Sequence, residues 1–174
     1  MGTGIQLCGL NGCGKSTLGK ALAARMGFHF IDNENLYFSR SDAHDPYTNP
    51  KSRAEVEVLL MEEVNKHPDF VFSAVKGDYG EEIISMYSYV IVIEVPKEIR
   101  AQRVRNRSFQ KFGNRMQPGG DLYDQEEAFF QMVDSREDDF IANWLQRVSC
   151  PIIRVDGTKP IEENVTYIIH TISQ

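Results

Sequence analysis

The chain has 174 residues, of which 41% are hydrophobic and 25% charged, and its formal net charge is −6. This length and composition predict one globular domain and exclude a wholly disordered chain, a collagen-like repeat and a coiled coil. The negative charge makes nucleic acid an unlikely partner and argues against a membrane partner, because the average surface repels polyanions. Any polyanionic ligand must therefore meet a local cluster of basic residues.

Cysteine content and hydropathy both favour a reduced, cytoplasmic protein. Cys8, Cys13 and Cys150 are an odd number at no zinc-ligand spacing, so neither a disulfide scaffold nor a structural zinc site is expected. The first residues lack the pattern of a secretory signal, and no apolar run approaches the roughly 20 residues that a membrane span needs. The four histidines show no metal-ligand spacing either, so we interpret them as structural or exposed.

Short apolar runs alternate with longer amphipathic stretches along the chain. The runs predict buried strands at residues 5–8, 28–31, 70–75, 89–95 and 152–155. Helical spacing of apolar residues occurs at 15–26, 51–67, 81–87, 97–107, 125–148 and 161–172, and another helix is expected to begin near residue 34. Strand–helix alternation predicts an α/β fold whose parallel sheet is covered by helices on both faces.

Two polar segments interrupt this alternation. Residues 41–50 carry two prolines, and residues 108–123 contain Gly113, Pro118, Gly119 and Gly120. Both follow helices that start beyond the C-terminal end of a strand, which is the edge where open α/β sheets bind ligands. Within a single domain over 1–174, we therefore expect an acceptor-binding excursion at about 33–67 and a mobile lid at about 108–123.

A phosphate-binding motif occupies residues 9–16, where GLNGCGKS matches G-x-x-x-x-G-K-[ST]. Its glycines let successive backbone N–H groups point at one anion, and the following helix N-terminus adds partial positive charge. The lysine would bridge the β- and γ-phosphates and the serine hydroxyl would reach Mg²⁺. The expected contacts to ATP come from Gly9, Asn11, Gly12, Cys13, Gly14, Lys15, Ser16 and Thr17.

The whole chain resembles the small P-loop kinases of the nucleoside-monophosphate kinase, shikimate kinase and gluconate kinase group. The resemblance rests on GLNGCGKST, FIDNE after the second strand, FSAVKGDY after the third, an arginine-dense segment before the lid, and VDGTKPIEE near the end. It implies a three-layer P-loop NTPase fold with five parallel strands in the order 2-3-1-4-5. It also implies ATP and Mg²⁺ as cofactors, a mobile lid, and transfer of the γ-phosphoryl group to a small acceptor.

Seven cationic residues lie between positions 97 and 115, where only Glu98 opposes them. Arginine holds phosphate bidentately, so the cluster fits a lid that neutralises charge during phosphoryl transfer. The alternative is a solvated helix face balanced by the eight carboxylates of residues 121–139. By resemblance, the catalytic candidates are Arg103, Arg107, Arg115 and Arg136, with Arg107 also an ATP ligand and Gly157 beside the adenine ring.

The acceptor side is less well defined. Asp32 follows the second strand and could hold Mg²⁺ with Ser16, act as catalytic base, or merely cap a helix. By resemblance, Glu34 matches a second acidic residue of shikimate and gluconate kinases. Ser73 stands where a Walker B acid is usual. The remaining acceptor-binding candidates are Arg40 or Arg53 for a phosphate and Lys76 for an anion, although Lys76 also fits a plain surface lysine.

Three functions remain open. The leading expectation is an ATP-dependent phosphotransferase for a small-molecule acceptor, either a nucleoside-monophosphate kinase or a nucleoside kinase. The alternative is a shikimate- or gluconate-kinase-like enzyme that phosphorylates a hydroxylated metabolite, with Asp32 as base. A non-kinase ATP-binding switch is a third possibility, although the GTPase motifs Asn-Lys-x-Asp and Asp-x-x-Gly do not occur. The chain is expected to act as a monomer or homodimer.

Overall fold

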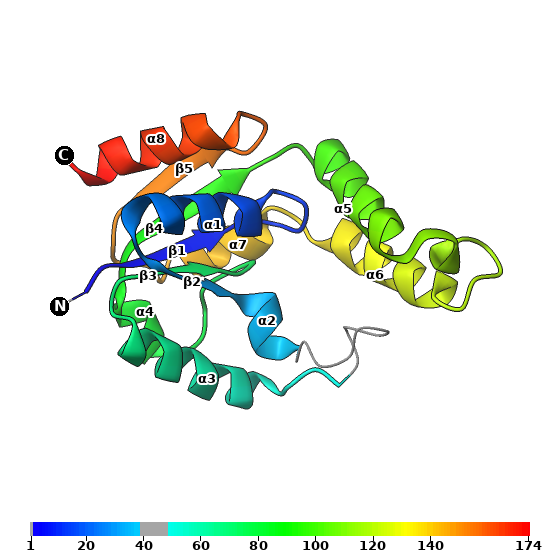
Figure 1. Ribbon diagram of the computed structural model, residues 1–174, viewed down its shortest axis with the longest axis horizontal. Helices are drawn as coiled ribbons and strands as arrows, with labels where there is room; N and C mark the ends of the chain where they lie inside the picture. The colour runs from blue at the N-terminus through cyan, green and yellow to red at the C-terminus, as the bar shows by residue number, and fades with distance from the viewer. Residues whose placement is uncertain (1, 39–48) are drawn as a thin grey trace.

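Five parallel strands form a central sheet in the order β2-β3-β1-β4-β5, as predicted. The computed structural model describes residues 2–38 and 49–174. β1 (Gly4–Cys8) lies between β3 (Phe70–Ser73) and β4 (Tyr87–Glu94), while β2 (His29–Asp32) and β5 (Ile152–Asp156) form the edges (Figure 1). All residues of β1 and β3 are buried, as expected for strands covered on both faces.

Helices cover both faces of the sheet, which gives three layers (Figure 1). On one face, α1 (Lys15–Met26) and α8 (Ile161–Ile172) pack on a core that includes Leu22 and Ile168, both fully buried. Side chains of a buried strand alternate between the two faces of the sheet, so Val92 of β4 belongs to the core on the other face.

The second face is covered by three other helices, α3 (Arg53–Lys66), α4 (Glu81–Ser85) and α7 (Asp139–Leu145). Their buried core includes Leu60 and Trp144. α3 begins with a reciprocal cap, in which the Ser52 hydroxyl accepts from the Glu55 backbone N–H and the Glu55 carboxylate accepts from that of Ser52.

An arm of three helical segments projects from this body (Figure 1). It consists of α5 (Lys97–Phe112), the 3₁₀ turn η1 (Gly113–Met116) and α6 (Tyr123–Ser135). The arm has a small apolar core of its own, made by Val104, Met116, Phe130 and Val133. The predicted lid, residues 108–123, lies within this arm, which is hereafter called the lid. None of the helices in the described ranges is both long and apolar enough to cross a membrane.

Two predicted helices differ from the structure by more than two residues. α5 continues five residues beyond 107, because 108–112 contain no helix breaker before Gly113, where φ is 55°. The helix predicted at 125–148 is two helices, α6 and α7, and the prediction of one continuous helix is wrong. The chain turns at Arg136, whose ψ of 115° is extended, so that the lid ends there and α7 returns under the sheet.

Two aliphatic residues of α3 lie on opposite faces of this helix, one buried and one exposed. Leu60 is fully buried whereas Val58 is 59% exposed. We expect Leu60→Ala to lower the free energy of unfolding by about 2–5 kcal/mol, since it leaves a cavity in the core. Val58→Ala should change it by less than about 0.5 kcal/mol. Urea denaturation of both variants measures the difference, and equal effects would contradict this packing.

Candidate active site

The phosphate loop follows β1 and turns tightly at the C-terminal edge of the sheet. Gly9 N–H donates to the Val75 carbonyl at 3.2 Å, which ties the loop to the chain after β3. Gly12 has φ 85°, and a Cβ atom there would lie 2.4 Å from the carbonyl oxygen of Arg100. Only glycine fits between the loop and α5 at this point.

Lys15 and Ser16 begin α1 and line a cavity that opens beside the loop. The Lys15 ammonium lies 3.4 Å from the Leu10 carbonyl and 3.8 Å from the Cys13 sulfur. Cys13 is 2% exposed, so its side chain packs behind the loop, and only its backbone could meet a phosphate. This arrangement of a loop, a lysine and a helix N-terminus is suited to bind a polyphosphate.

The cavity has a volume of about 760 Å³ and lies between the phosphate loop, α2 (Asn33–Tyr37) and the two lid helices. Ligand pockets of this size are typical of small-molecule sites. Its polar lining residues include Asn11, Lys15, Ser16, Asp32, Asn33, Glu34, Ser73, Arg103, Arg107, Ser108, Lys111, Gln125, Glu126 and Arg136.

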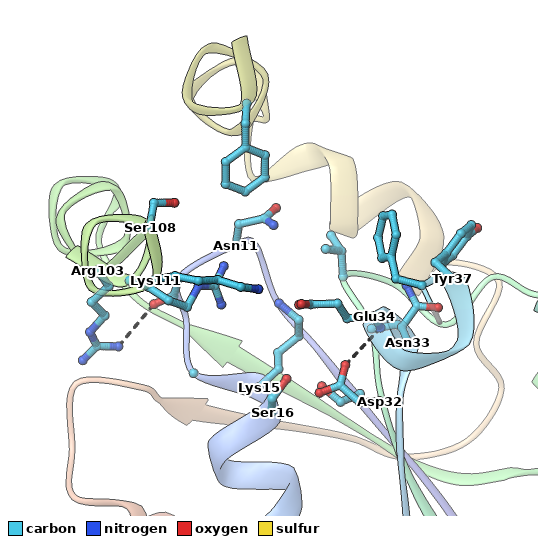
Figure 2. A pocket seen from close by; sticks show the side chains of 18 of the residues that line it. Asn11, Lys15, Ser16, Asp32, Asn33, Glu34, Tyr37, Arg103, Ser108 and Lys111 are labelled. Carbon is cyan, nitrogen blue, oxygen red and sulfur yellow. Dashed lines mark hydrogen bonds between the residues drawn. The ribbon is translucent and has the colours of Figure 1, made fainter. Parts of the chain in front are cut away.

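Asp32 and Ser73 lie side by side where β2 and β3 end. They are paired in the parallel register, and both line the cavity. Asp32 Oδ1 accepts a hydrogen bond from the Glu34 backbone N–H at 3.1 Å, so Asp32 caps α2, which is one of the roles that the sequence suggested (Figure 2). The Ser73 hydroxyl is buried without a hydrogen-bond partner in the described structure, which is a costly arrangement unless a ligand completes it.

The basic cluster divides into two groups. The acidic stretch of residues 121–139 pairs with four of its members, at N···O distances of 2.7–3.9 Å. These pairs are Lys97–Glu137, Arg100–Asp138, Arg105–Glu127 and Arg115–Asp121. Arg103, Arg107 and Lys111 instead line the cavity, one helical turn apart on α5.

Arg115 does not line the cavity, contrary to its predicted catalytic place. It holds Asp121 through both Nε and Nη2, because the turn after η1 brings this carboxylate back to it. Arg103 donates to the carbonyl of Gly12 at 3.4 Å (Figure 2). It also donates to the carbonyl of Gly157 at 3.2 Å, and so joins the phosphate loop to the loop after β5. Gly157 packs against the back of the phosphate loop and is absent from the cavity lining.

Arg136 reaches the phosphate loop from the segment between α6 and α7. Its guanidinium donates to the Asn11 side-chain oxygen at 2.8 Å and lies 5.2 Å from the centre of the Phe140 ring. Burial lowers the pKa of Arg136 from its ordinary value. The arginine nevertheless lines the cavity, where a bound phosphate would compensate the loss of hydration.

Two other acceptor candidates, Arg53 and Lys76, do not line the cavity. Arg53 pairs with Glu57 at 2.9 Å and donates to the Asp78 carbonyl. The Lys76 ammonium lies 4.4 Å from the centre of the Phe140 ring of α7. Arg40 lies outside the described residues.

Sequence reasoning missed an aromatic half of the cavity. Tyr37 and Phe38 line it from α2, while Phe112 and Phe129 line it from the lid. Among them stands Glu126, which is 4% exposed and whose Oε2 atom has no hydrogen-bond partner in the described structure.

Two lining residues that sequence reasoning did not select, Glu126 and Lys111, lie in recognisable sequence patterns. Glu126 shares the helical stripe of Phe130 and Val133, so it is a charged residue on an apolar face. Lys111 continues the spacing of Arg103 and Arg107 along α5. Figure 2 shows Lys111, Lys15 and Glu34 pointing into the same part of the cavity. Burial lowers the pKa of Lys111, while the nearby Glu34 carboxylate acts in the opposite direction.

The buried Cys8 thiol at the end of β1 makes the stability of the protein depend on pH in the alkaline range. Burial raises its pKa to about 12 from an ordinary value of 9.0. Above pH 9 the unfolded chain releases this proton while the folded chain retains it, so stability falls as the pH rises. We expect a fall of up to about 1.4 kcal/mol per pH unit from this thiol.

Urea denaturation at pH 8, 9 and 10 measures this effect. Cys8→Ala should flatten the decline between pH 9 and 10, where the buried tyrosines contribute equally to both proteins. Tyr79 and Tyr87 also have raised pKa values, chiefly through burial. Identical slopes for the two proteins would show that the Cys8 thiol is not protected by the fold.

The sheet order, the loop and the lid together define a P-loop NTPase fold of the small-kinase type. Residues 5–116 match the model of a family described as "AAA domain", and the chain belongs to that family. A relative, the uncharacterized protein YqaC of Bacillus subtilis (strain 168), is 26% identical over 177 residues, which cover 97% of each chain.

Solved structures show the same fold over nearly the whole chain. Shikimate kinase from Aquifex aeolicus vf5 has a TM-score of 0.56 and 19% identity, covering 98% of this chain and 96% of its own. A gluconokinase from Sinorhizobium meliloti 1021 has a TM-score of 0.57 and 16% identity, covering 95% and 87%. A sugar kinase from Janibacter sp. HTCC2649 has 0.56 and 15%, covering 99% and 95%. The predicted likeness to the small P-loop kinases is thus confirmed for the fold.

Proposed function

We propose that this protein is a kinase that transfers the γ-phosphoryl group of MgATP to a hydroxyl group of a small molecule. One observation carries the proposal: the phosphate-loop Lys15, the strand-end Asp32 and the lid Arg107 line a single cavity. Phosphoryl transfer needs these three components, since it depends on positioning and on neutralising spread negative charge. The neighbours named as shikimate kinase, gluconokinase and sugar kinase support this class.

The polyphosphate would lie along the loop and the start of α1, with Lys15 between the β- and γ-phosphoryl groups. Arg107 and Lys111 approach the same space from the lid. Their charges would meet the transferring group from the side opposite Lys15. Closure of the lid would exclude water and protect ATP from hydrolysis.

The residues at the strand ends fit Mg²⁺. The Ser16 hydroxyl, the Asp32 carboxylate and the orphaned Ser73 hydroxyl offer only oxygen atoms, which is the donor set that this hard cation prefers. Ser16 would bind the ion directly, while Asp32 and Ser73 would hold its water ligands. When bound, Mg²⁺ would neutralise charge on the β- and γ-phosphoryl oxygens.

Asp32 is the proposed base. Its Oδ1 atom holds the Glu34 backbone N–H, so Oδ2 would accept the proton of the attacking hydroxyl. The acceptor oxygen forms a bond to the γ-phosphorus as the bond from that phosphorus to the β–γ bridging oxygen breaks. ADP and the phosphorylated acceptor are the products. Hydrogen bonds from Arg136 to Asn11 and from Arg103 to the Gly12 carbonyl hold the phosphate loop in place.

Release of ADP from MgATP, with and without candidate acceptors, tests this function. Lys15→Ala should lower acceptor-stimulated turnover by about 100-fold or more, because it removes charge stabilisation in the transition state. Asp32→Asn should lower kcat by a similar factor while ATP binding, measured by calorimetry, stays within about threefold. Glu57→Gln, which lies outside the cavity, is the control. Full activity of Asp32→Asn would eliminate the base role.

We propose that the acceptor carries a nucleobase and a free hydroxyl group, as a nucleoside does; a nucleoside monophosphate would instead accept the phosphoryl group on a phosphate oxygen and would not need Asp32 as a base. Tyr37 and Phe38 line the cavity at the end of α2, and Phe112 and Phe129 line it from the lid. A flat heterocycle gains stacking energy between such walls. The unpartnered Glu126 Oε2 would accept a hydrogen bond from a ring or amino N–H group.

A hydroxylated metabolite without an aromatic ring is the second candidate. It is favoured by the Asp32–Glu34 pair of carboxylates near the loop and by the likeness to shikimate kinase and gluconokinase. Here Glu126 would accept from a hydroxyl group of the acceptor instead.

Glu126 and its neighbour Glu127 provide a matched pair of variants. Glu127 pairs with Arg105 on the outside of the lid. With a nucleobase acceptor, Glu126→Gln should raise the acceptor KM by about 10-fold or more and leave the ATP KM unchanged, whereas Glu127→Gln should change neither. The acceptors are nucleosides, nucleoside monophosphates, shikimate and gluconate. Turnover only with the last two would overturn the nucleobase proposal and retain the kinase.

A further inference from the structure

Two histidines and a glutamate gather at the edge of the sheet opposite to the cavity. His29 is the first residue of β2, Glu63 lies in the last turn of α3, and His67 caps that helix. One ligand atom from each lies within 4.8 Å of the other two, and His29 Nε2 is 3.0 Å from Glu63 Oε2. We propose that these three side chains bind one divalent transition-metal ion of the Zn²⁺ type.

The backbone around the cluster is held in place. His29 N–H donates to the Asp69 carbonyl at 3.0 Å, and His67 N–H donates to the Glu63 carbonyl at 2.9 Å. The Asp69 carboxylate in turn accepts from the Thr3 backbone N–H at 2.8 Å. The three side chains thus start from fixed positions on a strand and a helix, which lowers the entropic cost of assembling a metal site.

The spacing fits a tetrahedral ion after one side chain turns. Metal–ligand bonds of about 2.0–2.1 Å place neighbouring tetrahedral ligand atoms about 3.3 Å apart, close to the His29–Glu63 distance. The rings of His29 and His67 are stacked with centroids 3.8 Å apart, so their lone pairs lie in two nearly parallel planes and do not meet at one point. His67 must rotate to aim a ring nitrogen at the same ion, and its exposed place at a helix end allows this.

The ligand chemistry selects the class of ion. Two imidazoles with one carboxylate suit Zn²⁺, Co²⁺, Ni²⁺ or Cu²⁺, whereas Mg²⁺ prefers oxygen alone. The other oxygen of Glu63 lies 3.6 Å from the Lys66 ammonium, which orients the carboxylate. The side chains of His29 and Glu63 are 35% and 32% exposed, so water can fill a fourth position. The site is separate from the proposed kinase chemistry, because His29 begins β2 and Asp32 ends it.

Calorimetric titration of chelator-treated, nucleotide-free protein with ZnCl₂ tests the proposal. We expect one Zn²⁺ per chain, a dissociation constant that rises at least tenfold in His67→Ala and in Glu63→Gln, and no change in His170→Ala. His170 is the matched control, an exposed histidine of α8 that contacts Gln174. At a hundredfold excess over the dissociation constant, Zn²⁺ should raise the melting temperature of the wild type by about 5–10 °C.

Substitution with Co²⁺ gives a second readout that does not depend on the variants folding well. The wild type should acquire the visible absorption of a tetrahedral nitrogen- and oxygen-ligated ion, without the charge-transfer band that Cys8, Cys13 or Cys150 would produce. Zn²⁺ binding that is unchanged in His67→Ala, a thiolate spectrum, or no binding to the wild type would each overturn the proposal.

Discussion

The contact between the phosphate loop and the first turn of α5 is the constraint on which the site depends. The backbone of Gly12 lies against the carbonyl of Arg100, in a space where no Cβ atom fits. Arg100 itself is buried and donates to the Val95 carbonyl at 3.0 Å, so the start of α5 is fixed to the end of the sheet. The loop, the sheet edge and the root of the lid are therefore one rigid unit.

The run of positively charged residues on α5 and η1 serves two purposes. Arg105 and Arg115 face carboxylates on the outer side of the lid, where exposed pairs add little stability. Arg107 and Lys111 face the cavity. The outer pairs neutralise part of the cluster, so that the concentration of positive charge is confined to the inner face. The two interpretations of the sequence each describe one side of α5.

The sheet order and the phosphate loop could be predicted because their signals are local. The loop residues are contiguous, and the apolar runs report burial directly. The break near Arg136 was not predicted, because the extended backbone of Arg136 and its hydrogen bond to the distant Asn11 are apparent only in the tertiary structure. The partners of Arg115 and the pairing of His29 with Glu63 also depend on tertiary structure. Ser73 and Glu126 become candidates only once the structure shows them buried at a cavity wall, with a side-chain oxygen that has no hydrogen-bond partner among the described residues.

The hydrogen bond from Arg136 to Asn11 makes the lid and the phosphate loop mechanically continuous. Arg136 is the residue at which the chain leaves α6 and returns to the body, so a displacement of the lid pulls directly on the loop. A ligand held under the lid and a ligand held by the loop would then act on the same element. Their binding free energies would be coupled, and by thermodynamic reciprocity each would change the affinity for the other by the same factor.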